Sequence, residues 1–228
     1  MKPLIVANWK MNPSSLKGAK LLLNSVKRGI KKARNVEAVV CPSFPFISGL
    51  KSEISNLKLG AQDCFCEDKG AFTGEVSPKM LKDLGCQHVI LGHSERRRYL
   101  NETDEMVNKK IKAALKNNLK PVLCVENVLQ VKKGLKGISK KDFKNIVVAF
   151  EPVFAIGTGK PCHPQKAERM RKAIKNAVNA DIPIIYGGSV NSENARDYIE
   201  KAEFQGFLIG GASLKSGEFI KIIKKIAT

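Results

Sequence analysis

Eight short apolar runs divide the chain at fairly even intervals, and they constrain its fold more than any other feature. Each run is almost entirely apolar rather than alternating, which is typical of parallel strands covered on both faces. We therefore expect strands at Leu4–Ala7, Ala38–Cys41, Leu57–Ala61, Val89–Leu91, Val122–Val125, Ile146–Phe150, Ile184–Tyr186 and Phe207–Ile209.

Segments with a helical hydrophobic period lie between these runs. Serines predict where two of the helices begin: Ser14 or Ser15 before the first, and Ser192, followed by Glu193, before a later one. The clearest helical segments are Leu16–Ile30, Met106–Leu115, Ala167–Val178 and Phe219–Ile226.

Strand and helix alternate along the whole chain, which favours an α/β fold built as a closed (β/α)₈ barrel. An open, doubly wound sheet would need a Gly-rich turn after its first strand. That strand instead runs into Asn8–Lys10, and the chain contains neither G-x-G-x-x-G nor a Walker sequence. The least regular unit is Val128–Asn145, where Gly134 and Gly137 predict a short or broken helix.

The length of 228 residues allows a large core, and no linker-like or low-complexity stretch divides it. We expect one domain over residues 1–228. The apolar run at the N-terminus is too short for a secretory signal, and no segment is long enough to span a bilayer. These features predict a cytoplasmic protein without a membrane partner.

Cysteine and histidine usage argues against a metal site. The six cysteines are scattered, with no C-x-x-C pair and no zinc-ligand spacing, so we expect reduced thiols, several of them buried. Three histidines are too few to favour a histidine-built metal centre.

The formal net charge of +19 comes from Lys and Arg residues that are spread along the predicted helices. At those spacings they form solvated outer faces. Since aromatic interleaving and nucleic-acid-binding motifs are absent, we expect no nucleic-acid partner. A positive field would instead attract an anionic small molecule.

The segment Ala149–Gly159 carries a single carboxylate, Glu151, at the end of an apolar strand. Ionising a carboxylate there costs free energy unless water or a partner compensates. Pro152 then breaks the strand and a Gly-containing loop follows. The segment alone fits either a proton-abstracting base under a covering loop or a Glu that caps a strand end.

Three glycine-rich turns fall at neighbouring strand ends: Gly157–Gly159, Gly187–Ser189 and Gly210–Gly211. Any one of them could be a tight turn that needs positive φ. Together they predict a phosphate-binding corner, because their backbone N–H groups face an anion without an obstructing Cβ.

His93 and Lys10 also follow predicted strands. A histidine that faces a helix N-terminus tends to remain neutral, and Ser94 and Glu95 predict such a helix. Lys10 could be a surface charge, but its neighbours are apolar and a dianionic ligand would hold it. We expect Glu95 to lie near Lys10.

Six motifs in this order resemble the triosephosphate isomerase family, and they span nearly the whole chain. Together they form a highly specific set. They are NWKMN at Asn8–Asn12, TGE at Thr73–Glu75, GHSERR at Gly92–Arg97, FEPVFAIGTG at Phe150–Gly159, YGGSV at Tyr186–Val190 and GGASL at Gly210–Leu214.

The resemblance implies a TIM barrel and a role for each matched residue. The implied catalytic residues are Glu151 as base, His93 as electrophile, Lys10 and Asn8 as the substrate-holding pair, and Glu95 beside that lysine. The implied substrate- and phosphate-binding residues are Asn8, Lys10, Gly157, Ser189, Gly210 and Gly211. The implied lid is Pro152, Val153, Phe154, Ala155, Ile156, Gly157, Thr158, Gly159, Lys160, Pro161 and Cys162, and Tyr186 and Ser189 belong to the segment that receives it. The implied subunit contact involves Gln62, Thr73, Gly74 and Glu75.

The implied reaction interconverts dihydroxyacetone phosphate and D-glyceraldehyde 3-phosphate through an enediolate, in glycolysis and gluconeogenesis. It contains no redox step, so the resemblance implies neither cofactor nor metal. The expected partners are a phosphorylated three-carbon sugar and a second copy of the chain. Two alternatives remain: a barrel aldolase with a Schiff base on Lys10, and a non-catalytic basic protein that binds anions.

The chain departs from the family pattern at several positions. The usual tryptophan of the lid is Phe154, and Pro161 fixes φ at the far end of the lid. Glu126–Asn127 replaces the usual Gly-Glu, which predicts that Arg97 loses a carboxylate contact. The chain is also shorter than most members, mainly around Val128–Asn145.

Overall fold

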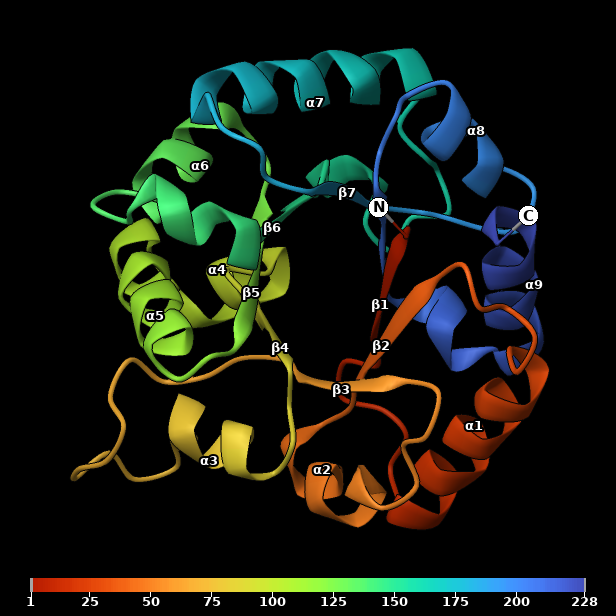
Figure 1. Cartoon of the computed structure of the whole chain (residues 1–228), viewed down its shortest axis with the longest axis horizontal. Helices are drawn as coiled ribbons and strands as arrows, with labels where there is room; N and C mark the ends of the chain where they lie inside the picture. Colours follow the sequence, from red (N-terminus) through yellow and green to blue (C-terminus); the bar gives the residue numbers. More distant parts are fainter. Residues whose placement is uncertain (1, 228) are drawn as a thin grey trace.

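A computed structural model, described here for residues 2–227, contains a closed barrel of eight parallel strands in the order β1 to β8, with β1 paired to β8 (Figure 1). The predicted fold class is therefore confirmed. The strands are β1 (Leu4–Asn8), β2 (Glu37–Cys41), β3 (Lys58–Ala61), β4 (His88–Leu91), β5 (Lys120–Val125), β6 (Val147–Phe150), β7 (Ile184–Gly187) and β8 (Gly206–Ile209).

Helices surround the barrel (Figure 1). They are α1 (Leu16–Gly29), α2 (Phe44–Lys51), α3 (Pro78–Asp83), α4 (Ser94–Leu100), α5 (Asp104–Lys116), α6 (Val128–Gly134), α7 (Pro164–Val178), α8 (Ala195–Glu200) and α9 (Ser216–Ile226). Three 3₁₀ helices complete the set: η1 (Lys140–Asn145), η2 (Val153–Ala155) and η3 (Gly211–Leu214). The short α6 followed by η1 confirms the broken helix expected at Val128–Asn145. Within residues 2–227, every helix is too short or too polar to cross a membrane.

One of the two predicted helix caps is confirmed and the other is wrong. The Ser15 hydroxyl accepts a backbone N–H in the first turn of α1, as an N-cap does. Ser192 does not cap α8, because its N–H and hydroxyl both donate to Glu218. The side chain of Asn191 organises this turn instead and accepts the N–H of Asn194 at 2.9 Å.

The strands are buried on both faces, which explains why their residues are apolar without alternation. One set of side chains fills the inside of the barrel and includes Val6, Val39, Ile90, Val122 and Leu208. A larger set packs between the strands and the helices, where Ile5, Leu59 and Leu123 belong. The barrel interior is thus a packed core that leaves only its two rims for polar groups.

Charged side chains gather where the strands begin. The Nε2 atom of His88 lies 3.6 Å from Glu37 Oε1, and Lys58 Nζ lies 2.7 Å from Glu37 Oε2. His88 is 1% exposed, and its Nδ1 has no hydrogen-bond partner. Burial lowers the pKa of His88 to about 4, although the Glu37 carboxylate opposes this shift.

We expect His88 to make the protein less stable in acid. The unfolded chain binds this proton below about pH 6.5, whereas the folded state binds it only near pH 4, so the free energy of unfolding decreases as pH falls through that interval. The full loss amounts to about 3 kcal/mol. Urea unfolding of His88→Asn and the parent protein between pH 8 and pH 4 measures it. Equal slopes in the two proteins would contradict this assignment.

Candidate active site

The carboxyl ends of the strands surround a cavity of about 360 Å³. Asn8 ends β1, Lys10 follows it, His93 lies just beyond β4, and Glu151 lies directly after β6. All four side chains line this cavity. The barrel therefore brings together residues that are more than 140 positions apart in the sequence.

Glu151 is 4% exposed, yet its surroundings favour the ionised form. Its Oε1 lies 3.2 Å from His93 Nε2, and its Oε2 accepts the Ser94 N–H at 3.3 Å. Burial by itself raises the pKa of Glu151. The charge and hydrogen bond of His93, the Ser94 N–H and the Cys124 thiol outweigh burial, so the net pKa lies below its usual value. Glu151 is therefore a buried carboxylate that is ready to accept a proton.

His93 lies directly before α4, as predicted, and its Nδ1 accepts the Glu95 N–H at 3.3 Å. That contact places a lone pair on Nδ1 and the ring proton on Nε2, facing Glu151. Burial has the largest single effect and lowers the pKa of His93, but the charge and hydrogen bond of Glu151 together with the charge of Glu95 outweigh it, so the net shift is upward. The hydrogen bond from the Glu95 N–H favours a neutral His93 ring, whereas the Glu151 carboxylate favours a protonated one. Neutrality of His93 stays a prediction.

Lys10 is held in a strained backbone conformation. Its φ of 55° is uncommon for a residue with a side chain. Asn8 Oδ1 accepts the Lys10 N–H at 3.0 Å, and the Lys10 carbonyl accepts hydrogen bonds from Ser43 and Gln62, both at 2.8 Å. The ammonium of Lys10 pairs with Glu95, as the sequence led us to expect. These contacts fix the direction of the lysine side chain.

The three glycine-rich turns meet at one side of the cavity. Gly157, Ser189, Gly210 and Gly211 all line it. A Cβ on Gly210 would lie 2.9 Å from Lys10 Cε, so a side chain at this turn would displace the end of the lysine side chain. Lys215 also lines the cavity, and our sequence analysis missed it. Lys215 directly follows the GGASL motif, and this position could have indicated that it lies at the same site.

The segment Pro152–Cys162 covers the edge of the cavity. It begins with η2, and Ser189 donates its hydroxyl to the Ala155 carbonyl at 2.7 Å. Phe154 is 55% exposed, and Lys166 Nζ lies 5.0 Å from its ring centroid. Apart from Pro152 and Ala155, the residues of this segment before Cys162 are exposed or only partly buried, which fits the prediction of a lid that moves.

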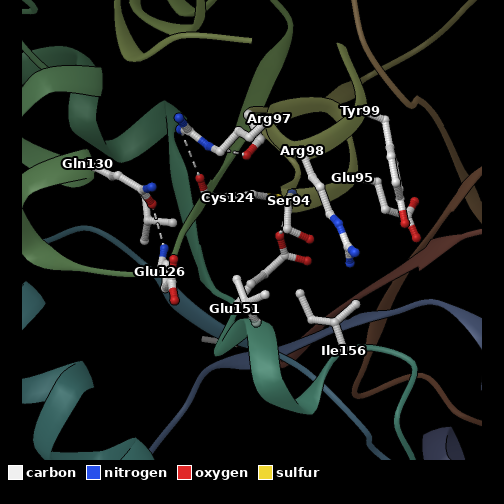
Figure 2. Close-up of a pocket in the computed structure, with 13 residues that line it drawn as sticks. Ser94, Glu95, Arg97, Arg98, Tyr99, Cys124, Glu126, Gln130, Glu151 and Ile156 are labelled. Atoms are coloured by element: carbon white, nitrogen blue, oxygen red, sulfur yellow. Dashed lines mark hydrogen bonds between the residues drawn. The ribbon is translucent and has the colours of Figure 1, made fainter. Parts of the chain in front are cut away.

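A second cavity of about 430 Å³ lies beside the first and shares Glu151 with it. In Figure 2, Gln130 and Arg98 lie on opposite sides of the Glu151 side chain. Cys124, near the end of β5, also lines this space. Residues of the GHSERR and FEPVFAIGTG motifs line it as well, but the sequence analysis did not predict a second cavity there.

Arg97 has a carboxylate partner from another element, because Asp104 at the start of α5 accepts its Nη1 at 2.7 Å. Among the described residues, its hydrogen bonds include none to Glu126 or Asn127, so the expected loss of a contact from that segment is not contradicted. The Arg97 Nε donates to the Gly92 carbonyl at 2.7 Å. The replaced segment Glu126–Asn127 therefore does not leave this guanidinium without an anion.

The residues predicted at a subunit contact fall into two groups. Gln62 is turned inward and donates to the carbonyls of Lys10 and Cys41 at 2.8 and 2.9 Å. Thr73, Gly74 and Glu75 are exposed, in a loop between β3 and α3 that protrudes from the rim of the molecule (Figure 1). The loop thus combines an inner end that touches the active site with an outer end open to solvent.

Comparison with known proteins agrees with this geometry. The model of the family described as triosephosphate isomerase matches residues 3–226. Triosephosphate isomerase of Alkaliphilus oremlandii is 43% identical over 246 aligned positions, which cover 97% of this chain and 98% of the relative. The enzyme of the same name from Endomicrobium trichonymphae is 42% identical over 98% of each chain, and that of Caldanaerobacter subterraneus is 41% identical over 97% and 98%.

These alignments are longer than the 228 residues of the chain, so the chain carries gaps relative to its relatives. The shorter chain nevertheless retains the barrel, the cavity and all six sequence motifs. By its sequence, the chain belongs to the triosephosphate isomerase family.

Proposed function

We propose that the chain is a triose-phosphate isomerase that interconverts dihydroxyacetone phosphate and D-glyceraldehyde 3-phosphate, with residues 1–228 forming one catalytic domain. The observation that carries this proposal is the meeting of Glu151, His93 and Lys10 at one cavity whose far side consists of glycine-rich turns. Family membership does not favour the aldolase or the non-catalytic alternative.

Glu151 acts as the base in this proposal and moves a proton between adjacent carbons. The carbon acid is weak, so the main barrier is the negative charge of the enediolate. Hydrogen bonds from the His93 ring, the Ser94 N–H and the Cys124 thiol favour the ionised form of Glu151, and these do not require a charged His93. Burial removes the water that would otherwise solvate and weaken the base.

His93 and Lys10 stabilise the developing oxyanion. The Nε2–H of His93 points into the cavity beside Glu151, and the Lys10 ammonium adds a positive charge. The pairing of a carboxylate base with a neutral histidine is the established pattern of this enzyme class. Asn8 and Glu95 position Lys10 through its backbone and its ammonium, respectively.

Backbone N–H groups of the turns at Gly157, Ser189, Gly210 and Gly211 bind the phosphate group in this proposal. Lys215 contributes a positive charge on the same side. The lid closes over the enediolate, excludes water and prevents the loss of phosphate. No step requires a metal or a redox cofactor.

We propose a homodimer in which the exposed tip of the loop at Thr73–Glu75 contacts the second copy near its active site. The inner end of the same loop lies beside the active site of its own chain, because Gln62 donates to the Lys10 carbonyl. The loop would therefore connect the two active sites of a dimer. We also place the reaction in the cytosol, where it serves glycolysis and gluconeogenesis. Sedimentation equilibrium measures the number of subunits, and a monomer at micromolar concentration would contradict the dimer.

A coupled assay tests the function: glyceraldehyde 3-phosphate is supplied, and the dihydroxyacetone phosphate formed is reduced by an auxiliary dehydrogenase. We expect turnover without added metal, unchanged by a chelator. A purified, folded protein that fails to convert either triose phosphate would overturn the proposal.

Ser189→Asp should raise KM at least ten-fold, because a carboxylate beside the phosphate site repels a dianionic substrate. The effect on kcat should be smaller, since Ser189 does not touch the reacting carbons. Ser139→Asp is the matched control, because it adds the same charge at an exposed position before η1. An unchanged KM in Ser189→Asp would count against the proposed phosphate site.

A further inference from the structure

Two tyrosine hydroxyls hold the far end of the lid. The Cys162 N–H donates to Tyr186 Oη at 3.1 Å, and the Tyr198 hydroxyl donates to the Cys162 carbonyl. Both backbone polar groups of Cys162 are therefore bonded to side chains outside the lid. Cys162 is 2% exposed, so water does not replace these contacts easily.

The sequence around Cys162 explains why this residue is the one held. Pro161 has no N–H, and Pro164 begins α7. Between Pro161 and Pro164, only Cys162 and His163 therefore have a backbone N–H to donate. His163 is exposed and Cys162 is buried, so Cys162 is the residue of this pair whose N–H is held inside the protein.

The two tyrosines form a rigid unit. Their rings stack with centroids 4.1 Å apart and planes inclined by 12°. Phe204 packs against both rings at 5.5 and 6.4 Å. Tyr186 and Tyr198 are each at most 1% exposed, so neither hydroxyl has another position available.

The same unit touches the proposed phosphate site. A Cβ on Gly188 would lie 2.5 Å from Tyr186 Oη, so the phosphate-binding turn rests directly on this hydroxyl. Tyr198 belongs to α8, which follows that turn in the chain. The end of the lid and the phosphate-binding turn therefore share one support.

We propose that Tyr198 is a positioning residue for lid closure, which acts through the Cys162 carbonyl. This inference rests on the proposed function. With Cys162 held, the lid closes about a defined pivot and covers the enediolate completely. Without the Tyr198 hydroxyl the pivot shifts, so the lid closes less often and less tightly.

A loosely covered enediolate has a second route. Its carbon–oxygen bond to phosphate breaks, the electron pair leaves with the phosphate oxygen, and the remaining three-carbon enol becomes a dicarbonyl compound. Inorganic phosphate is then released in place of the isomer. The ratio of phosphate release to isomerisation consequently reports how well the lid is closed.

Tyr198→Phe tests the inference, because it removes only the hydroxyl and keeps the stacked ring. Loss of one buried hydrogen bond predicts a decrease of about ten-fold in kcat/KM, mainly in kcat. We also expect the share of turnovers that release phosphate to rise at least several-fold. Phosphate and isomer are measured in the same reaction, with dihydroxyacetone phosphate as substrate.

Phe143→Leu is the matched control. It shortens another buried aromatic side chain, on η1, which is in ring contact with neither tyrosine, so it should lower the melting temperature and leave the phosphate share unchanged. A parental phosphate share in Tyr198→Phe, or an equal rise in both variants, would overturn the inference. So would a Tyr198→Phe protein that fails to fold while Phe143→Leu folds, since it would show a structural role. If the parent protein isomerises neither triose phosphate, the proposed function fails first and the inference fails with it.

Discussion

Glu151→Gln should lower kcat by about 10²–10⁴, while KM stays within a few-fold of the parental value. Glutamine keeps the size of the side chain but has no basic oxygen for a carbon-bound proton. Ser94 N–H and His93 Nε2 both face the Glu151 oxygens, so the new amide must place its NH₂ beside one of these two groups. We therefore also expect a small loss of stability.

Steady-state kinetics in both reaction directions measure this effect. Glu126→Gln is the control, because Glu126 is exposed and lines only the neighbouring cavity. It should keep the parental kcat. Near-normal turnover of Glu151→Gln would remove Glu151 from the role of base, whatever the control shows.

Lys110→Met should lower the free energy of unfolding by about 3–5 kcal/mol. Lys110 is 4% exposed and donates to both oxygens of Asp63, at 3.0 and 2.8 Å, and also to Glu102. Arg96 Nη2 lies 2.8 Å from the same Asp63 carboxylate. Removing the ammonium leaves two buried carboxylates facing one arginine, and burying such charges without a partner is costly.

Lys116→Met is the matched control on the same helix. Its ammonium also pairs with a carboxylate, that of Asp68, but the lysine side chain is 74% exposed. Such surface pairs contribute about 1 kcal/mol or less. Urea unfolding at pH 7 compares the two variants, and equal losses would show that the buried cluster stabilises no more than a surface pair does.

The strands were predictable because burial on both faces leaves only apolar residues. The differences lie at strand boundaries, and the polar ones are mostly where strands begin: Glu37, His88 and Lys120 belong to β2, β4 and β5. Those residues lie at the rim of the barrel, where side chains of neighbouring strands satisfy one another. The hydrophobic pattern of a single strand contains no information about such partners.

The meeting of the proposed catalytic residues at one cavity was predictable, because they lie at or shortly after the ends of strands and all strands of a parallel barrel end on one rim. Contacts between side chains that come from separate helices and strands could not be predicted from the sequence. Asp104 on α5 binds the guanidinium of Arg97, and the Asn191 side chain, rather than Ser192, accepts a hydrogen bond in the turn before α8. The role of Tyr198 could not be predicted either, because its hydroxyl donates to the carbonyl of Cys162, which is 36 positions away in the sequence. Only the folded chain brings such pairs together.

Closure of the barrel makes the proposed active site depend on strands from both ends of the described chain. Leu4 in β1 pairs with Gly206 in β8, and Lys10 passes beside Gly210. A nascent chain that still lacks its last strand leaves one edge of β1 open and has no completed wall around Lys10. The proposed site can therefore form only in chains that have joined β8 and the turn at Gly210–Gly211 to β1, however early the other seven strands assemble.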